Sequence, residues 1–244
     1  MKTIKNAFFL MFSLSMTSCT LTKYFPSPVT SPMLSEKDEI RMTAGMPGYI
    51  SVAYSPAENV GIYASSFFTR EMLISESRTQ KGDHFTMEFA GGYYKKDPDN
   101  DGIVEVYGGI GVGKFSIKEE GLAGNFRFKS PTMKIFIHPS IGWKRKKFEA
   151  AFNFRITGLK FGNYSTNFSN ESIVENRLED LNRGMDFFIE PAITLRFGLK
   201  NVKFDYQSGV SLPFRKSPSY SYLPVLGTFG ISVNLTKDLF KKQE

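Results

Sequence analysis

Cysteine and histidine are scarce in this sequence, which has one cysteine and two histidines among 244 residues. A lone cysteine cannot form an internal disulfide. Long apolar runs are missing too, and the mean hydropathy of −0.23 argues against a helical membrane protein. The net charge of +7 is spread thinly, without a continuous basic stripe, so the composition indicates no nucleic-acid partner.

Aromatic residues and glycine are abundant instead, with 24 Phe, 11 Tyr and 21 Gly. The stretch Met133–Tyr164 shows how they are arranged, as two alternating runs joined by the basic turn Lys144–Lys147. Side chains of a strand point alternately to its two faces, so these runs predict a β-hairpin with one apolar and one polar face. Each run reaches the roughly 9–11 residues that a tilted strand needs to cross a bilayer.

The rest of the chain repeats this unit and gives ten candidate strands. They cover Glu39–Met46, Gly48–Ser55, Val60–Thr69, His84–Tyr94, Ile103–Phe115, Phe126–Trp143, Phe148–Tyr164, Met185–Phe197, Val202–Phe214 and Leu223–Leu235. We therefore predict an all-β fold, an antiparallel up-and-down β-barrel of about ten strands (alternatively eight) that crosses a membrane. The count depends on whether Met46-Pro47-Gly48 forms a turn.

The connections between these strands alternate in length. We expect short ones at Ser55–Asn59, Lys95–Gly102, Lys144–Lys147 and Leu199–Asn201, and long ones at Arg70–Asp83, Ser116–Asn125, Ser165–Gly184 and Arg215–Tyr222. Short periplasmic turns, long outer loops and an aromatic girdle at each interface are typical of outer-membrane barrels. Aromatic residues gather near the short turns (Tyr54, Tyr93, Tyr94, Trp143, Phe148, Phe197, Phe204) and near the long loops (Phe67, Phe68, Phe85, Phe115, Phe161, Tyr164, Phe187, Phe214).

The start of the chain predicts export. Residues 1–18 have a positive end and a short apolar core, as a signal peptide does. Met16-Thr17-Ser18 before Cys19 resembles the lipobox of bacterial lipoproteins, which implies that Cys19 becomes the mature N-terminus and carries lipid such as palmitate. Residues 19–37 contain three prolines without periodicity and predict an extended tether. The barrel then occupies residues 38–236 and a basic periplasmic tail residues 237–244.

The strand pattern and Cys19 together resemble the outer-membrane β-barrel lipoproteins of diderm bacteria. The last strand adds a local resemblance, because Thr228–Leu235 fits the β-signal of outer-membrane proteins. These resemblances imply a bacterial outer-membrane location, with outer-membrane lipid as a partner and the lipid of Cys19 on the periplasmic side. We expect no enzymatic activity and no cofactor. A structural or adhesive role would use the long loops, above all Ser165–Gly184, to contact a protein or surface ligand.

Two motifs resemble ligand sites. Gly108–Lys114 resembles a phosphate loop, but Phe115 stands where a P-loop needs Ser or Thr, and the segment alternates as a strand. Asp97, Asp99 and Asp101 match the first half of an EF-hand loop, but no glutamate stands at its twelfth position. We expect no metal site, with these three aspartates as the candidate for weak calcium binding.

Charged residues recur on the polar faces of the strands. They are Glu88, Glu105, His138, Glu149, Arg155, Glu190, Arg196, Lys203 and Asp205. If the apolar faces meet lipid, all of them point into the lumen. The interior of a ten-stranded barrel is narrow, and an unpaired buried charge is costly. We therefore expect a polar network that plugs the barrel rather than a transport path.

Two alternatives remain. His138, Ser140 and Glu149 share the polar faces of adjacent strands and resemble the catalytic set of lipid A deacylases, although Ile141 stands where that family has Asn. This resemblance implies a lipid-modifying hydrolase. In the second alternative, the apolar faces line the interior of a soluble, lipocalin-like, lipid-anchored barrel that binds a hydrophobic ligand.

Overall fold

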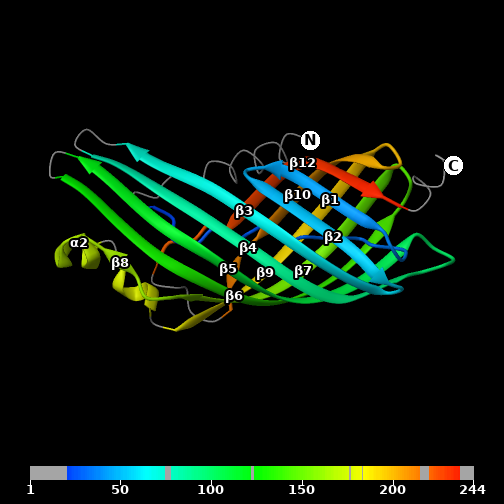
Figure 1. Cartoon of the computed structure of the whole chain (residues 1–244), viewed down its shortest axis with the longest axis horizontal. Coiled ribbons are helices and arrows are strands. Elements are labelled where there is room, and N and C mark those ends of the chain that lie inside the picture. The colour runs from blue at the N-terminus through cyan, green and yellow to red at the C-terminus, as the bar shows by residue number, and fades with distance from the viewer. Residues whose placement is uncertain are drawn as a thin grey trace, which may run out of the picture.

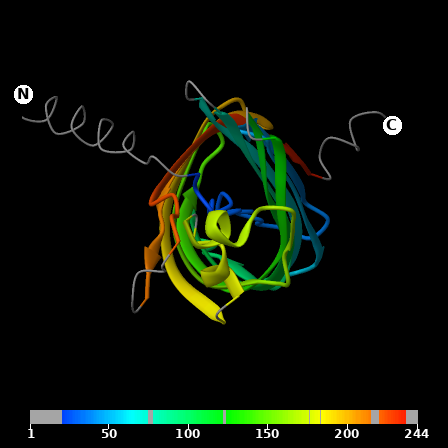
Figure 2. The same ribbon diagram turned by 90° about the vertical axis from the view of Figure 1, so that its left-hand side faces the viewer.

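The computed structural model describes residues 21–74, 78–121, 124–175, 177–182, 184–214 and 220–236. The predicted signal peptide (residues 1–18), Cys19 and the basic tail (residues 237–244) lie outside these ranges. Within them the chain folds into one sheet that closes on itself (Figures 1 and 2).

Twelve strands make up the sheet. They are β1 (Ile40–Met46), β2 (Tyr49–Ala57), β3 (Val60–Ile74), β4 (Arg78–Lys96), β5 (Gly102–Gly121), β6 (Gly124–Lys144), β7 (Phe148–Phe161), β8 (Ser165–Thr166), β9 (Met185–Gly198), β10 (Val202–Val210), β11 (Leu212–Pro213) and β12 (Val225–Leu235). All but the two-residue β8 and β11 form an antiparallel ring, in which β9 pairs with β7 and β10, and β12 pairs with β10 and β1. The predicted ten-stranded barrel is confirmed.

The helical part of the described residues is small. It consists of α2 (Asn170–Glu175) and the 3-10 turn η1 (Glu179–Asn182), both in the connection between β7 and β9. No helix of the described residues is long and apolar enough to cross a membrane.

The barrel has a tall wall and a low wall. Strands β3 to β6 contain 15, 19, 20 and 21 residues, whereas β1, β2, β10 and β12 contain 7, 9, 9 and 11. We call the end with the β2–β3, β4–β5, β6–β7 and β9–β10 connections the turn end, and the opposite end the loop end. The tall wall projects at the loop end, on the left of Figure 1.

Two of the expected long loops are tall hairpins. The β3–β4 ladder continues to the pair Ile74 and Thr79, and the β5–β6 ladder to Gly121 and Gly124. The sequence suggested loops because charged residues interrupt the apolar alternation near residue 70 and again near residue 116. A ladder needs paired backbone groups, not apolar side chains, so the strands continue past charged residues on the outer face.

The turn on which the strand count depends is present. β1 and β2 pair up to Gly45 and Tyr49, so residues 46–48 connect them directly. Gly48 has a positive φ of 45°, and a Cβ there would lie 2.2 Å from the carbonyl oxygen of Phe68. Only glycine combines this conformation with this close approach.

The apolar faces of the strands point outward. On β5, Val104, Val106, Ile110 and Val112 are exposed, while their neighbours Glu105 and Tyr107 are buried. The lipocalin-like alternative needed the reverse arrangement and is wrong.

Aromatic residues divide between the two faces. Tyr93, Trp143, Phe148, Phe197, Phe204, Phe68, Phe85, Phe187 and Phe214 are exposed, whereas Tyr94, Phe67, Phe115 and Phe161 are buried. Adjacent strand residues such as Phe67 and Phe68 must face opposite sides, so the girdles contain only part of the expected set.

Residues 21–35, which we call the lumen segment, run inside the barrel (Figure 2). Every residue from 21 to 34 except Phe25 is buried. The sequence led us to expect a free tether here. The difference has a physical reason, because a segment with three prolines has fewer backbone N–H groups to satisfy in a lumen. Its apolar side chains also gain from burial.

Candidate functional site: the plugged lumen

The lumen segment enters at the loop end beneath an apolar cap. Leu21 and Tyr24 pack in one buried cluster with Phe161, Leu178 and Tyr220. Tyr24 forms a bridge with Tyr222: the Lys23 N–H donates to the Ser221 carbonyl at 2.9 Å, and the Leu223 N–H donates to the Tyr24 carbonyl at 2.9 Å. Leu178 belongs to the connection between β7 and β9, which lies over the barrel mouth with α2 in front of it in Figure 2.

Below the cap, Ser27 is held by a buried ion cluster. Its carbonyl accepts a hydrogen bond from Arg155 Nη2 at 2.7 Å, and its hydroxyl contacts Glu88 and lies 3.0 Å from Lys134 Nζ. Arg155 also bonds Glu190 through Nε at 2.7 Å and Glu88 through Nη1 at 3.2 Å. Each of these charges has a charged partner, which removes most of the cost of burying it.

Tyr24 connects the segment to the same cluster. Its hydroxyl donates to Glu190 Oε1 at 2.8 Å, and its ring centroid lies 4.8 Å from that of Phe188. Glu190 further accepts from Thr157 at 2.6 Å and from Ser211 at 3.2 Å. This carboxylate is therefore surrounded by donors from the barrel wall and from the lumen segment.

The middle of the segment is bound through its backbone. The Val29 N–H donates to Gln207 Oε1 at 2.8 Å, and Gln207 Nε2 donates to the Val29 carbonyl at 2.5 Å. The side-chain amide of Gln207 thus takes the place of a neighbouring strand. Next to it, the Thr30 and Tyr49 hydroxyls lie 2.6 Å apart.

A second ion cluster holds the segment near the turn end. Glu149 contacts Arg41, lies 3.3 Å from Arg196 Nη1 and 3.0 Å from Lys203 Nζ. Arg196 also bonds Asp205 at 2.5 Å and donates to the Ser31 carbonyl at 2.8 Å.

Lys144 completes this anchor. It donates to the Met33 carbonyl at 2.9 Å and contacts Glu39. Its neighbours in the predicted basic turn are exposed, but Lys144 itself reaches into the barrel.

All nine charged residues expected in the lumen lie there and are buried. The ion cluster near the cap, which we call the upper cluster, contains Glu88, Arg155 and Glu190. The ion cluster near the turn end, which we call the lower cluster, contains Glu149, Arg196, Lys203 and Asp205. Glu105 accepts from the Leu34 N–H at 3.3 Å and from Ser140 at 3.2 Å. His138 bonds Asn153 at 3.2 Å.

Sequence reasoning missed Glu39, Arg41, Lys134 and Lys144 as members of these clusters. Lys134 lies on the polar face of an alternating run, so the alternation itself could have identified it. Arg41 and Glu39 stand at the start of a short strand, where alternation gives little signal. The apolar residues in the predicted tether were the sign that this segment does not stay in water.

Little free space remains beside the lumen segment. A hollow next to Pro26–Val29 measures about 20 Å³, and one next to Lys23–Phe25 about 10 Å³. Each has room for about one water molecule.

The residues of the hydrolase alternative are not brought together. Within the described chain, His138 bonds Asn153 and Ser140 bonds Glu105, while Glu149 is held by cations of the lower cluster. A nucleophilic serine needs a base within hydrogen-bond reach, and that base needs an orienting partner. Neither contact exists in this arrangement.

The two ligand-like motifs form a hydrogen-bonded turn and a part of a strand. Asp97 accepts bonds from the Asp99 N–H at 3.0 Å and from Asn100 at 3.1 Å, and the Asn100 bond lowers the pKa of Asp97. Asp101 pairs instead with Arg145 at 2.8 Å. No group of three metal-ligating side chains occurs in the described ranges. Gly108–Lys114 lies within β5, as its alternation predicts.

Comparison with known proteins gives a fold-level similarity. No family model matches the sequence, and no curated protein matches it significantly. Among solved structures, the chain is similar to the translocator domain of the autotransporter NalP from Neisseria meningitidis. The TM-score is 0.46 at 11% identity, covering 80% of this chain and 86% of that one. The closed barrel described above rests on the strand pairing of this chain itself.

Proposed function

We propose that this protein is an outer-membrane β-barrel closed by its own N-terminal segment, and that it acts as a non-enzymatic platform for interactions at its loop end. The apolar outer wall supports the membrane location. On β6 the outward residues from Met133 to Trp143 are apolar over eleven positions, enough for a tilted strand to cross a bilayer.

One observation carries the closed state, namely the burial of residues 21–34 in the lumen between two ion clusters. An open pore of this size would be lined by hydrated polar side chains. Here the same side chains bond the carbonyls of Ser27, Val29, Ser31 and Met33. Solute passage would require breaking these contacts together.

A partner would bind at the loop end of the barrel. The connection between β7 and β9 covers the mouth, with Leu178 and Leu181 buried and Val174 exposed on α2. A protein or surface ligand would therefore meet a folded cap rather than a mobile arm. This supports the interaction role that the sequence suggested for Ser165–Gly184.

The lumen segment also bears on lipid attachment. Leu21 lies at the loop end, beside Tyr220 and Phe161. Cys19 precedes Leu21 by two residues in the sequence, and a chain extends at most about 3.6 Å per residue. A lipid on Cys19 would therefore be attached near the loop end, in the outer leaflet, whereas the sequence led us to expect the periplasmic side.

Conductance in planar bilayers tests the closed state. We expect full-length protein that shows a heat-dependent shift on gels to insert without current steps. Removing residues 22–33 should produce steps, because it empties the lumen. If that variant does not fold, Ser27→Cys gives a second readout, since the buried thiol should resist a charged thiol reagent. Current steps from the intact protein, or rapid labelling of residue 27, would contradict the proposal.

An epitope inserted between Thr20 and Leu21 tests the position of the lipid end. Antibody should bind it on intact cells, whereas the same epitope after Thr236, at the turn end, should require permeabilised cells. The opposite result would return the lipid to the periplasmic side. The non-enzymatic role predicts that Ser140→Ala and His138→Ala leave the acyl chains of membrane lipids unchanged by mass spectrometry.

A further inference from the structure

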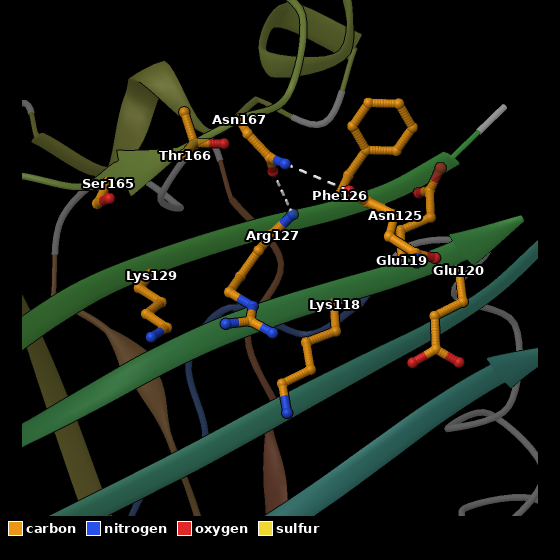
Figure 3. A pocket seen from close by; sticks show the side chains of 10 residues that line it. All are labelled: Lys118, Glu119, Glu120, Asn125, Phe126, Arg127, Lys129, Ser165, Thr166 and Asn167. Atoms are coloured by element: carbon orange, nitrogen blue, oxygen red, sulfur yellow. Dashed lines mark hydrogen bonds between the residues drawn. The ribbon is translucent and has the colours of Figure 1, made fainter.

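The outer face of the tall wall carries four cations close together. They are Lys114 and Lys118 of β5 and Arg127 and Lys129 of β6, which we call the basic patch. Lys114, Arg127 and Lys129 are exposed and Lys118 is half-buried. Figure 3 shows Lys118, Arg127 and Lys129 extending in the same direction from the two strands.

The basic patch lacks counter-charges, unlike its surroundings. Nearby, Arg70 pairs with Asp83 at 2.5 Å and Lys81 pairs with Glu120 at 3.3 Å. Across the described part of the chain, none of the four patch side chains has an ion-pair partner. Of the two carboxylates beside the patch, Glu120 pairs with Lys81, and Glu119 accepts a hydrogen bond from Gln80.

The strand register concentrates this charge. Lys118 lies directly opposite Arg127, and Lys129 is opposite Ser116. Directly opposite residues have Cβ atoms about 4.5–5.5 Å apart, where like charges destabilise a sheet. An anion between Lys118 and Arg127 would turn this repulsion into two attractive contacts.

The patch begins where the apolar wall ends. Val112 precedes Lys114 by two positions on the same face of β5, and on β6 the exposed Pro131 and Met133 follow Lys129 on the same face. Two residues of a strand tilted by about 45° rise about 5 Å. Acyl chains on Val112 and Met133 would thus place the start of a headgroup at Lys114, with its more distant parts toward Lys118 and Arg127.

A hollow accompanies the cations. It has a volume of about 450 Å³. Its lining includes the cations Lys118, Arg127 and Lys129, the carboxylates Glu119 and Glu120, and residues of the cap such as Asn167 (Figure 3). The Arg127 N–H donates to Asn167 Oδ1 at 2.6 Å, and Asn167 Nδ2 donates to the Asn125 carbonyl at 3.2 Å. These bonds fix the cap against β6, so the hollow is a built feature of the wall.

We propose that the basic patch binds the phosphate groups of a phosphorylated glycolipid in the outer leaflet, with the acyl chains of that lipid along Val112 and Met133. The inference rests on the proposed function, which puts the tall wall in the membrane with the loop end outward. Arginine and lysine form short, charge-assisted bonds with phosphate. A lipid carries its phosphate next to its acyl chains, so one molecule can contact the basic patch and the apolar wall together.

Lipid-dependent thermal stability tests the proposal on the full-length protein in neutral detergent. The probes are diphosphorylated lipid A, its dephosphorylated form, and inorganic phosphate at the same concentration. The test variant is Lys118→Gln/Arg127→Gln/Lys129→Gln. The control, Lys95→Gln/Lys146→Gln/Lys147→Gln, removes the same charge from exposed positions at the turn end.

We expect diphosphorylated lipid A to raise the melting temperature of the wild type and of the control, with the dephosphorylated form and inorganic phosphate giving little effect. The test variant should bind diphosphorylated lipid A about tenfold or more weakly, because one charge-assisted contact accounts for about that factor. Equal binding by the test variant, equal effects of the dephosphorylated lipid, or protection by inorganic phosphate alone would overturn the inference. If the protein shows the heat-dependent gel shift but its melting temperature does not respond to lipid phosphate, only this inference is wrong. If the protein does not insert into membranes, the proposed function is wrong.

Discussion

Gln207 binds both backbone groups of Val29, accepting from its N–H at 2.8 Å and donating to its carbonyl at 2.5 Å. Gln207 thus bonds the backbone of the lumen segment in the way that a neighbouring strand would. Val29 lies between Ser27, which is bound by Arg155, and Ser31, which is bound by Arg196.

Gln207→Ala should destabilise the protein by about 1–3 kcal/mol, because it leaves buried backbone groups without partners. It should also make residues 21–35 more sensitive to protease. Gln80→Ala is the matched control, since Gln80 is buried in the lumen but bonds Glu119 and not the segment. Urea unfolding and limited proteolysis measure the two effects. Equal proteolysis of both variants would show that Gln207 does not hold the segment.

Arg155→Ala should cost about 3–5 kcal/mol, because it leaves Glu88 and Glu190 buried without their shared cation. Arg145→Ala removes an exposed pair with Asp101 and should cost about 1 kcal/mol or less. Urea midpoints, followed by the gel shift of the folded band, compare the two. Similar midpoints would mean that the upper cluster contributes no more than a surface ion pair.

Adjacent glycines of β5 should respond differently to a methyl group. A Cβ on Gly109 would lie 2.4 Å from Phe136 Cζ and 2.5 Å from the Phe89 carbonyl oxygen, so Gly109→Ala should cost about 1–3 kcal/mol. Gly108 faces outward with nothing within 4 Å, so Gly108→Ala should change stability by about 0.5 kcal/mol or less. Thermal unfolding distinguishes them, and a costly Gly108→Ala would contradict the assigned faces.

Trp143, the single tryptophan, reports on the membrane directly. It is 55% exposed on the outer wall near the turn end, where amphipathic rings favour the bilayer interface. Its emission should be blue-shifted in vesicles and quenched by lipid brominated near the headgroup. In Trp143→Phe/Phe136→Trp the new ring faces the lumen and should escape this quenching. Strong quenching of Trp143 by aqueous acrylamide instead would show that the wall is in water.

The barrel and the two faces of its strands could be predicted, because burial of every second residue appears in the sequence as alternation of apolar and polar residues. Met133, Ile135 and Ile137 are exposed and Lys134 and His138 are buried, as the alternation requires. The tall hairpins were missed because Arg70 and Lys81 carry no apolar signal, although their backbones remain paired.

The lumen segment could not be predicted from local pattern. Its contacts are made with residues far along the chain, such as Ser27 with Arg155 and Val29 with Gln207. Three prolines and several hydroxyl residues give the composition of a linker, and its apolar residues favour burial without indicating which surface buries them. The basic patch likewise appears only when β5 and β6 are placed in register.

The lumen segment continues within a few residues into β1, and β1 closes the ring against β12. The lumen is filled by buried side chains and bounded by a hydrogen-bonded ring, which hinders residues 21–35 from threading into a barrel that is already closed. We therefore expect the sheet to close around a segment that is already in place. The topology thus favours an order of assembly with the occupant inside before the wall is complete.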